Sequence, residues 1–237
     1  TKHRHFDVKG ASAGGGKIVY QLGADLRVYD VATKRDRLVP ITLVSDFDQQ
    51  RERWVKKPLR YLTSAHLSPS GERVLLTARG RVFNVPARAG RRIEVTRRPG
   101  VRFREARFVS DDELLAFSDE SGEVELWSAA ADGIGPKRQL TKDAKVLYHG
   151  LTPSPDGQHV VFVDKNYGMW LYEKKGGKRS LLRTGKIDAP GHFSWSPDSR
   201  YLAFVDAVEN RNRVIYLYDT KTNKTHRATS PRVDSYG

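Results

Sequence analysis

Short hydrophobic runs recur along the chain in pairs, and polar turn residues separate the two members of each pair. The first run of each pair covers residues 17–20, 73–76, 113–117, 159–163 and 201–205, and the second covers residues 26–30, 82–83, 125–127, 169–172 and 215–218. Both are rich in β-branched and aromatic residues, which favour strands, and both are too short for helices. The pattern therefore predicts neighbouring β-strands throughout the chain.

The turn before each first run has a recurring sequence. Ser68-Pro69-Ser70-Gly71 returns as SPDG at 154–157 and as SPDS at 196–199, with a degenerate copy at 109–112 and a glycine turn at 14–16. Proline presets φ, Asp or Ser caps the bend through its side chain, and glycine supplies a positive φ. The starts at positions 68, 109, 154 and 196 are 41, 45 and 42 residues apart.

This nearly constant interval distinguishes two all-β architectures. Four short strands repeated about every 42 residues are typical of the blades of a β-propeller. A β-sandwich also has short strands and turns, but it would not repeat the same turn sequence at a fixed interval. We therefore predict an all-β fold, a β-propeller of four-stranded blades, with residues 1–237 as a single propeller fragment.

The repeat predicts five blades and the stub of a sixth. The blades cover residues 5–43, 62–97, 101–141, 145–183 and 190–228, and residues 231–237 approach the next one. An incomplete ring leaves sheet faces and edges uncovered. We therefore expect either that the chain is part of a longer protein, or that it closes its open ends as a homo-oligomer or by exchanging strands.

The segment 44–61 interrupts the repeat with an insertion that is dense in charge and contains Trp54 and Tyr61. One interpretation is an exposed excursion whose aromatic side chains pack back on the edge of a blade. The other is a loop that borders a binding channel or contacts a neighbouring domain.

The charge balance is strongly basic, with 42 Lys and Arg against 28 Asp and Glu, a formal net charge of +14. Such a field attracts polyanions. The basic residues are scattered as short pairs with acids between them, which favours solvated strand faces and no specific nucleic-acid partner. No apolar run approaches the ~20 residues of a spanning helix, so we expect no membrane partner.

The sequence contains no recognisable catalytic or metal-binding arrangement. It has no cysteine and no G-x-S-x-G motif, and its seven histidines lack the spacing of metal ligands. We therefore predict no catalytic residue, no metal and no cofactor within this chain.

Residues that face the axis of a propeller lie on the innermost strand of each blade. The positions four residues before each turn copy are equivalent and hold Ser64, Glu105, Gly150 and His192. Arg102, Arg104 and His149 lie beside them in the sequence. We predict a polar, partly basic channel wall that guides a peptide through backbone contacts and its terminal carboxylate. The alternative is a hydrated lining without a ligand.

Several stretches resemble the propeller region of tricorn-type proteases. They are GKIVYQLGADLRVYDV at 16–31, ITLVSD at 41–46 with the insertion that follows, TARG at 77–80 with VFNV at 82–85, and FSDESGE at 117–123. The resemblance covers nearly the whole chain and corresponds to the second, seven-bladed propeller of that family.

The resemblance implies a very large hydrolase whose PDZ-like domain and serine peptidase core lie outside this chain. It also implies that the propeller channel routes peptides to or from the enclosed active site, so that peptides and the other domains are the partners. The catalytic serine and histidine of the family lie outside the part of the family pattern that this chain matches. A cytoplasmic location is implied, with the periplasm as the alternative.

Three functions remain open at this point. The first is a non-catalytic propeller that gates or guides peptides in a tricorn-like serine protease. The second is a TolB-like scaffold that recognises a partner protein. The third is a polyanion-binding propeller that uses the net positive charge.

Overall fold

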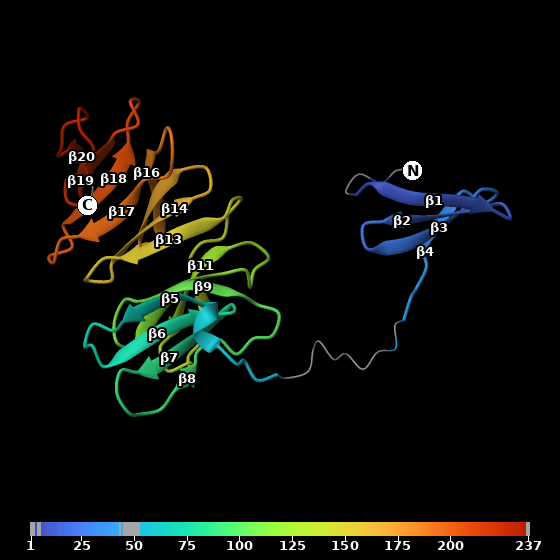
Figure 1. Cartoon of the computed structure of the whole chain (residues 1–237), viewed down its shortest axis with the longest axis horizontal. Coiled ribbons are helices and arrows are strands. Elements are labelled where there is room, and N and C mark those ends of the chain that lie inside the picture. Colours follow the sequence, from blue (N-terminus) through green and yellow to red (C-terminus); the bar gives the residue numbers. More distant parts are fainter. Residues whose placement is uncertain (1–2, 4–5, 43, 45–52, 236–237) are drawn as a thin grey trace. The chain divides into compact units, whose positions relative to one another are not determined.

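The computed structural model describes residues 3, 6–42, 44 and 53–235. Its strands form five four-stranded antiparallel sheets, and the described residues contain one short 3-10 helix, η1 (Pro58–Tyr61), and no α-helix. The predicted all-β fold of four-stranded blades is therefore confirmed (Figure 1). No helix in the described ranges is long and apolar enough to cross a membrane.

Each sheet is a meander of four consecutive strands. The first comprises β1 (Val8–Gly14), β2 (Lys17–Leu22), β3 (Asp25–Asp30) and β4 (Arg35–Leu38), and the second comprises β5 (Leu62–Leu67), β6 (Arg73–Ala78), β7 (Arg81–Pro86) and β8 (Ile93–Glu94). The third comprises β9 (Phe103–Phe108), β10 (Glu113–Ser118), β11 (Glu125–Ala130) and β12 (Arg138–Gln139). The fourth comprises β13 (Tyr148–Pro153), β14 (His159–Asp164), β15 (Gly168–Glu173) and β16 (Lys178–Thr184), and the fifth comprises β17 (Gly191–Trp195), β18 (Tyr201–Ala207), β19 (Arg213–Asp219) and β20 (Lys224–Arg227).

The chain divides into two compact units, Thr1–Val55 and Lys56–Gly237. The first unit holds the sheet β1–β4, where the buried Tyr20 donates a hydrogen bond of 2.9 Å to Asp36. The second unit holds the other four sheets. The assignment of both units to a single propeller remains a prediction.

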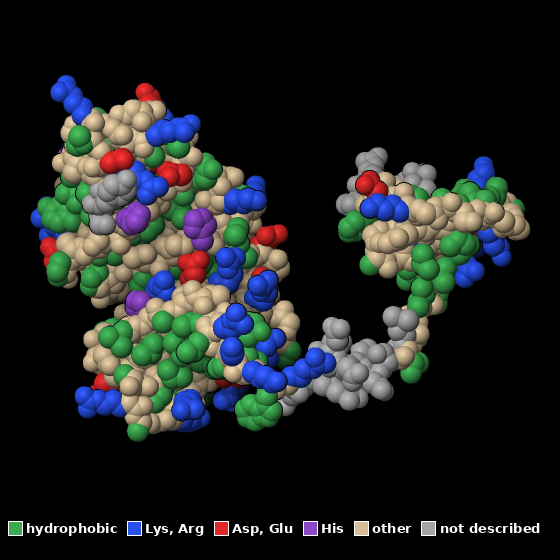
Figure 2. Space-filling view, viewed as in Figure 1, with side chains coloured by type: hydrophobic (Ala, Val, Ile, Leu, Met, Phe, Trp, Pro, Cys, Tyr) green, Lys and Arg blue, Asp and Glu red, His purple; other side chains and the backbone are tan. Residues whose placement is uncertain are grey.

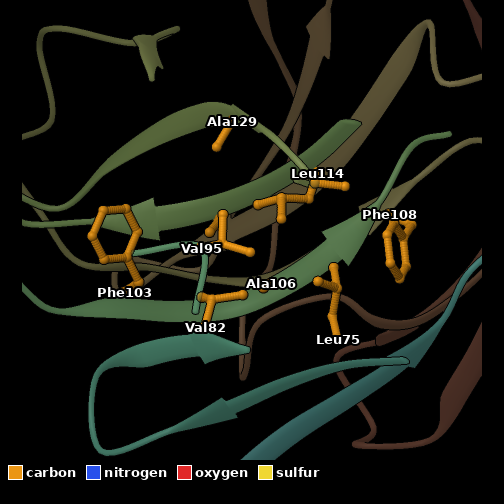
Figure 3. Packing of buried hydrophobic residues seen from close by; sticks show 10 residues of the cluster. Leu75, Val82, Val95, Phe103, Ala106, Phe108, Leu114 and Ala129 are labelled. Atoms are coloured by element: carbon orange, nitrogen blue, oxygen red, sulfur yellow. The ribbon is translucent and has the colours of Figure 1, made fainter. Parts of the chain in front are cut away.

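The four sheets of the second unit stack face to face. Strand β5 contacts β9, and β9 contacts β13, so the first strands of the second, third and fourth sheets lie next to one another. Three clusters of buried hydrophobic residues fill the spaces between successive sheets. Figure 3 shows the first cluster, in which Leu75 and Val82 of the second sheet meet Phe103, Ala106 and Leu114 of the third. Each fully buried Leu or Phe contributes roughly 1.5–3 kcal/mol through removal from water.

The second strands of the inner sheets are buried on both faces. In β14, Val160 and Phe162 belong to one cluster while Val161 and Val163 belong to the next. Successive side chains of a strand point to opposite faces. This explains why such strands are continuous apolar runs in the sequence and do not alternate with polar residues.

The recurring turns have the chemistry that their sequence predicts. Gly71 and Gly157 adopt φ values of 76° and 66°, and Ser199 occupies the same place with a φ of 59°. Asp156 accepts a hydrogen bond from the Gln158 amide at 3.0 Å, which closes the bend. The turns also link neighbouring sheets, because the Asp156 amide donates to the Ser199 hydroxyl at 3.0 Å.

The insertion 44–61 falls partly outside the described residues, which resume at residue 53. Trp54 is 99% exposed. The ring of Tyr61, at the end of η1, lies against the guanidinium of Arg79, which is 5.2 Å from the ring centroid. Of the two aromatic side chains, Tyr61 therefore packs beside the β6–β7 turn and Trp54 faces solvent.

Candidate functional site

The predicted axis-facing residues lie on or beside the first strands of four sheets. Ser64 lies on β5, Arg104 and Glu105 on β9, His149 on β13 and His192 on β17, while Arg102 directly precedes β9. The structure therefore brings these residues to equivalent edges of successive sheets. Whether they line a channel remains a prediction.

A β-bulge interrupts each of these first strands. The pairing shifts by one residue between Leu115 and Phe117 opposite β9, between His149 and Thr152 in β13, and between Gly191 and Ser194 in β17. The first bulge residue has a positive φ in all three strands, with 53° at Glu105, 74° at Gly150 and 53° at His192. Such bulges leave backbone groups of the strand free to bond elsewhere. In β5 the shift falls one position earlier, between Leu62 and Ser64.

Glu105 uses its bulge position to bond the next sheet. Its carboxylate oxygen Oε2 accepts hydrogen bonds from the backbone amides of Gly150 at 2.7 Å and Leu151 at 3.1 Å. Hydrogen bonds to an ionised acceptor are stronger than those between neutral groups. Glu105 therefore joins β9 to β13 by hydrogen bonds, a role that the sequence pattern did not predict.

Arg102 and Arg104 border a small hollow of about 70 Å³, together with Phe117, Ser118, Asp119 and Val124. The Arg102 amide donates to the Asp119 carboxylate at 2.8 Å, which fixes the backbone at the start of β9. Neither guanidinium forms an ion pair with a described acidic residue. The hollow therefore combines two guanidinium groups with the single carboxylate of Asp119, and it has room for a group the size of a second carboxylate.

Lys and Arg side chains are also numerous elsewhere on the surface. Figure 2 shows them spread over the visible face, with several gathered next to η1 and β9. Some of the neighbouring cations are neutralised, because Glu120 pairs with Arg98 and with Lys137. Arg102 and Arg104 are therefore among several cations of this region, with Arg79 and Arg97, that form no ion pair with a described acidic residue.

His66 on β5 and Arg107 on β9 form a second polar pair on the first strands. They are not among the residues that the sequence pattern predicted to face the axis. Burial lowers the pKa of His66, and the positive charge of Arg107 lowers this pKa further. The neutral ring accepts a hydrogen bond at Nδ1 from the Phe108 amide, at 3.1 Å. The alternation of polar residues with Ala65 and Leu67 was the only signal for His66 in the sequence.

The remaining predicted residues differ in exposure. His149 is half-buried and His192 is exposed. The Ser64 hydroxyl is buried and has no hydrogen-bond partner among the described residues. Within the same residues, no three His, Asp or Glu side chains are grouped so that they could hold a metal ion.

Comparisons with known proteins give a consistent result. Residues 62–237 match the profile of the family described as the tricorn protease second beta propeller domain. A tricorn protease homolog of Saccharolobus solfataricus is 23% identical over 204 residues, which cover 86% of this chain and 18% of the homolog.

Two solved structures show the same fold at low sequence identity. The crystal structure of the tricorn protease superposes with a TM-score of 0.70 at 14% identity, covering 99% of this chain and 23% of that one. TolB from Acinetobacter baumannii superposes with a TM-score of 0.56 at 15% identity, covering 86% of this chain and 48% of TolB. The chain thus spans about a quarter or less of the length of the tricorn relatives that it matches.

Proposed function

The chain belongs to the family of the tricorn protease second β-propeller domain, and from this premise we propose that it guides peptides toward a peptidase core that lies outside it. The matched relatives are much longer than this chain, which fits a part that works beside other domains of one protease. The described residues contribute binding and orientation to this function and no bond cleavage.

The hollow beside Arg102 and Arg104 carries this proposal. Two guanidinium groups and one carboxylate, that of Asp119, give the hollow an excess of positive charge, which attracts a peptide carboxylate. They lie at the start of β9, where the first strands of successive sheets are adjacent. A peptide that moves along these strands would meet the two charges at its C-terminal end. The half-buried His149 and the exposed His192 are proposed as further polar contacts along the same strands, while the buried hydroxyl of Ser64 is not.

The test is the Arg102→Ala/Arg104→Ala double variant in the full-length protease. We expect kcat/KM to fall about tenfold for peptides with a free C-terminal carboxylate, equivalent to about 1.4 kcal/mol of lost binding. Peptides with an amidated C-terminus should be affected much less. The Arg88→Ala/Arg92→Ala variant removes the same charge from an exposed loop of the second sheet and serves as the control.

Unchanged turnover of the carboxylate peptides in the double variant would reject the guiding role. The similarity to TolB would then favour the second candidate, a scaffold that recognises a partner protein. The cytoplasmic location is likewise a proposal, and cell fractionation of the parent organism tests it.

A further inference from the structure

The β-bulges of the first strands are joined to the preceding sheet by side-chain oxygens. At the junction of the second and third sheets, the Ala106 amide in the β9 bulge donates to the Thr77 hydroxyl at 3.2 Å. At the junction of the third and fourth sheets, Glu105 accepts from both bulge amides of β13. Each of these two bulges therefore receives an oxygen acceptor from the sheet before it.

The third junction lacks such an acceptor. The position that Glu105 occupies in β9 is taken by Gly150 in β13, and the position of Thr77, fifth in β6, is taken by Val163, fifth in β14. Neither residue has an oxygen in its side chain. Among the described residues, no side chain accepts a hydrogen bond from the amides of His192 or Phe193, which form the β17 bulge.

The neighbourhood of Gly150 has room for an acceptor. A Cβ atom added to Gly150 would lie 3.4 Å from Val163 Cγ2 and 3.8 Å from Phe193 Cε2, which are ordinary van der Waals distances. The positive φ of Gly150 would strain a side chain, but Glu105 carries a full side chain at a φ of 53°, so the chain tolerates this conformation at the equivalent position. The glycine therefore leaves out the group that would otherwise bond the β17 bulge.

We propose that the β17 bulge is a binding position for a carboxylate supplied by a peptide. An oxygen of that carboxylate accepts from the amides of His192 and Phe193, in the way that Glu105 accepts from Gly150 and Leu151 one sheet earlier. The carboxylate comes from the peptide C-terminus or from an Asp or Glu side chain. This proposal deepens the peptide-guiding function and rests on it for its biological meaning.

The chemistry of the position favours a carboxylate. The chain itself places a carboxylate on the corresponding amide pair of β13, so the spacing of two successive bulge amides suits one carboxylate oxygen. The side chains of Val163 and Phe193 are apolar and lie beside the position. A small planar anion on a peptide fits these surroundings, because its remaining chain can contact apolar groups.

The experiment follows the backbone amides of the isotopically labelled 237-residue chain by NMR while peptides are added. The probes are N-acetyl-trialanine with a free carboxylate, the same peptide with a C-terminal amide, and amidated N-acetyl-Ala-Glu-Ala. We expect saturable shifts of the His192 and Phe193 amides with the first probe and none with the second. The third probe reports whether a side-chain carboxylate is also accepted.

Two variants supply the missing acceptor from within the chain. Gly150→Glu reproduces Glu105, and Val163→Thr reproduces Thr77, so each should weaken binding of the free-carboxylate peptide at least fivefold. Val205→Thr makes the same change at the fifth position of β18 and serves as the matched control, with unchanged binding.

The proposal is overturned if the two bulge amides do not respond in the unmodified chain, or if the amidated trialanine moves them equally. It is also overturned if binding is the same in Gly150→Glu and Val163→Thr as in the control. The binding experiment is independent of proteolysis. Carboxylate binding at the bulge without any effect of Gly150→Glu on peptide turnover would therefore leave the binding site and show that it takes no part in guiding, whereas the Arg102→Ala/Arg104→Ala variant tests the guiding function itself.

Discussion

Two residues with large side chains adopt backbone conformations that glycine normally occupies. Glu105 and His192 both have a φ of 53° at the first position of a β-bulge. A left-handed conformation costs a residue other than glycine about 1–3 kcal/mol. At Glu105 the hydrogen bonds of its carboxylate to the β13 amides offset this cost. His192 has no corresponding bond to a described residue.

Urea unfolding of Glu105 variants separates the cost of the strained backbone from the stabilisation by the carboxylate hydrogen bonds. Glu105→Ala removes the carboxylate and keeps the strained backbone, so we expect a loss of about 2 kcal/mol. Glu105→Gly also removes the carboxylate but relieves the strain, so it should be less harmful by roughly 1 kcal/mol. Equal stability of the alanine and glycine variants would show that the backbone strain at this position is negligible.

Gly185 is a residue whose size matters more than its φ. A Cβ atom there would lie 1.9 Å from the carbonyl oxygen of Asp188 and 3.1 Å from Pro190 Cδ. We expect Gly185→Ala to lower the unfolding free energy by about 1–3 kcal/mol, because the loop before β17 must shift. Gly191→Ala is the control, since nothing lies within 4 Å of its added Cβ. A neutral Gly185→Ala would mean that this loop moves freely.

Single residues also show where sequence reasoning ends. The glycines of the turns could be predicted, because the conformation they need is set by their immediate neighbours. The bond of Glu105 could not, because its partner Gly150 is 45 positions away. Glu105 was selected as a polar residue at the axis, and only the packing of β9 against β13 reveals which amides it bonds.

At the scale of elements, an ion pair joins the beginning of one strand to the end of its neighbour. Arg200, just before β18, contacts the Asp219 carboxylate at the end of β19 at 3.0 Å. The Asp219 carboxylate also accepts from the Lys221 amide at 2.9 Å. The hydrogen bond from Arg200, with the Lys221 amide, lowers the pKa of Asp219 to about 2.

This depressed pKa predicts a particular dependence on pH. The pKa is lower in the folded chain, so the stabilisation is fully present above about pH 4 and is lost as the pH falls through about 2. The stability difference between the unmodified chain and Asp219→Asn should therefore shrink over that window. NMR titration of the carboxyl carbon tests the cause, since Arg200→Ala should move the pKa of Asp219 toward 3.8. A pKa of Asp219 that stays at about 2 in Arg200→Ala would show that Arg200 is not the cause of the low value.

The strands themselves were largely predictable from the sequence. The runs at 73–76, 159–163 and 201–205 fall within β6, β14 and β18, because turn residues with fixed backbone preferences bound them on both sides. The outermost strands β8 and β12 have only two residues each. Pairing with a neighbouring strand defines them, and a pattern of side chains does not.

At the scale of the whole molecule, the sheets of the second unit are joined only to their neighbours. Each hydrophobic cluster lies between two successive sheets, so stability is a sum over neighbouring pairs. A sheet between two clusters is therefore better protected than a sheet that contributes to one. The repeat in the sequence predicted this arrangement, while the separation into two units was not predicted.

Hydrogen exchange should be slowest in the sheets that lie between two hydrophobic clusters. Amides of β10 and β14, whose side chains contribute to two clusters each, should exchange most slowly. Amides of β20, whose four residues are all exposed, should exchange fastest in the second unit. Mass spectrometry of peptic fragments measures the exchange rates of these strands. Protection of β20 equal to that of β14 would show that the sheets unfold together.

Three side-chain acceptors, two oxygens and one ring nitrogen, bond backbone amides of a neighbouring sheet in the same direction along the chain. Thr77, His66 and Glu105 all belong to the earlier sheet of their pair, and the amides that they accept from belong to the later one. As a nascent chain leaves the ribosome, the completed second and third sheets already present these acceptors to the sheet that follows each of them. Assembly at these two junctions can therefore advance in the same order as synthesis.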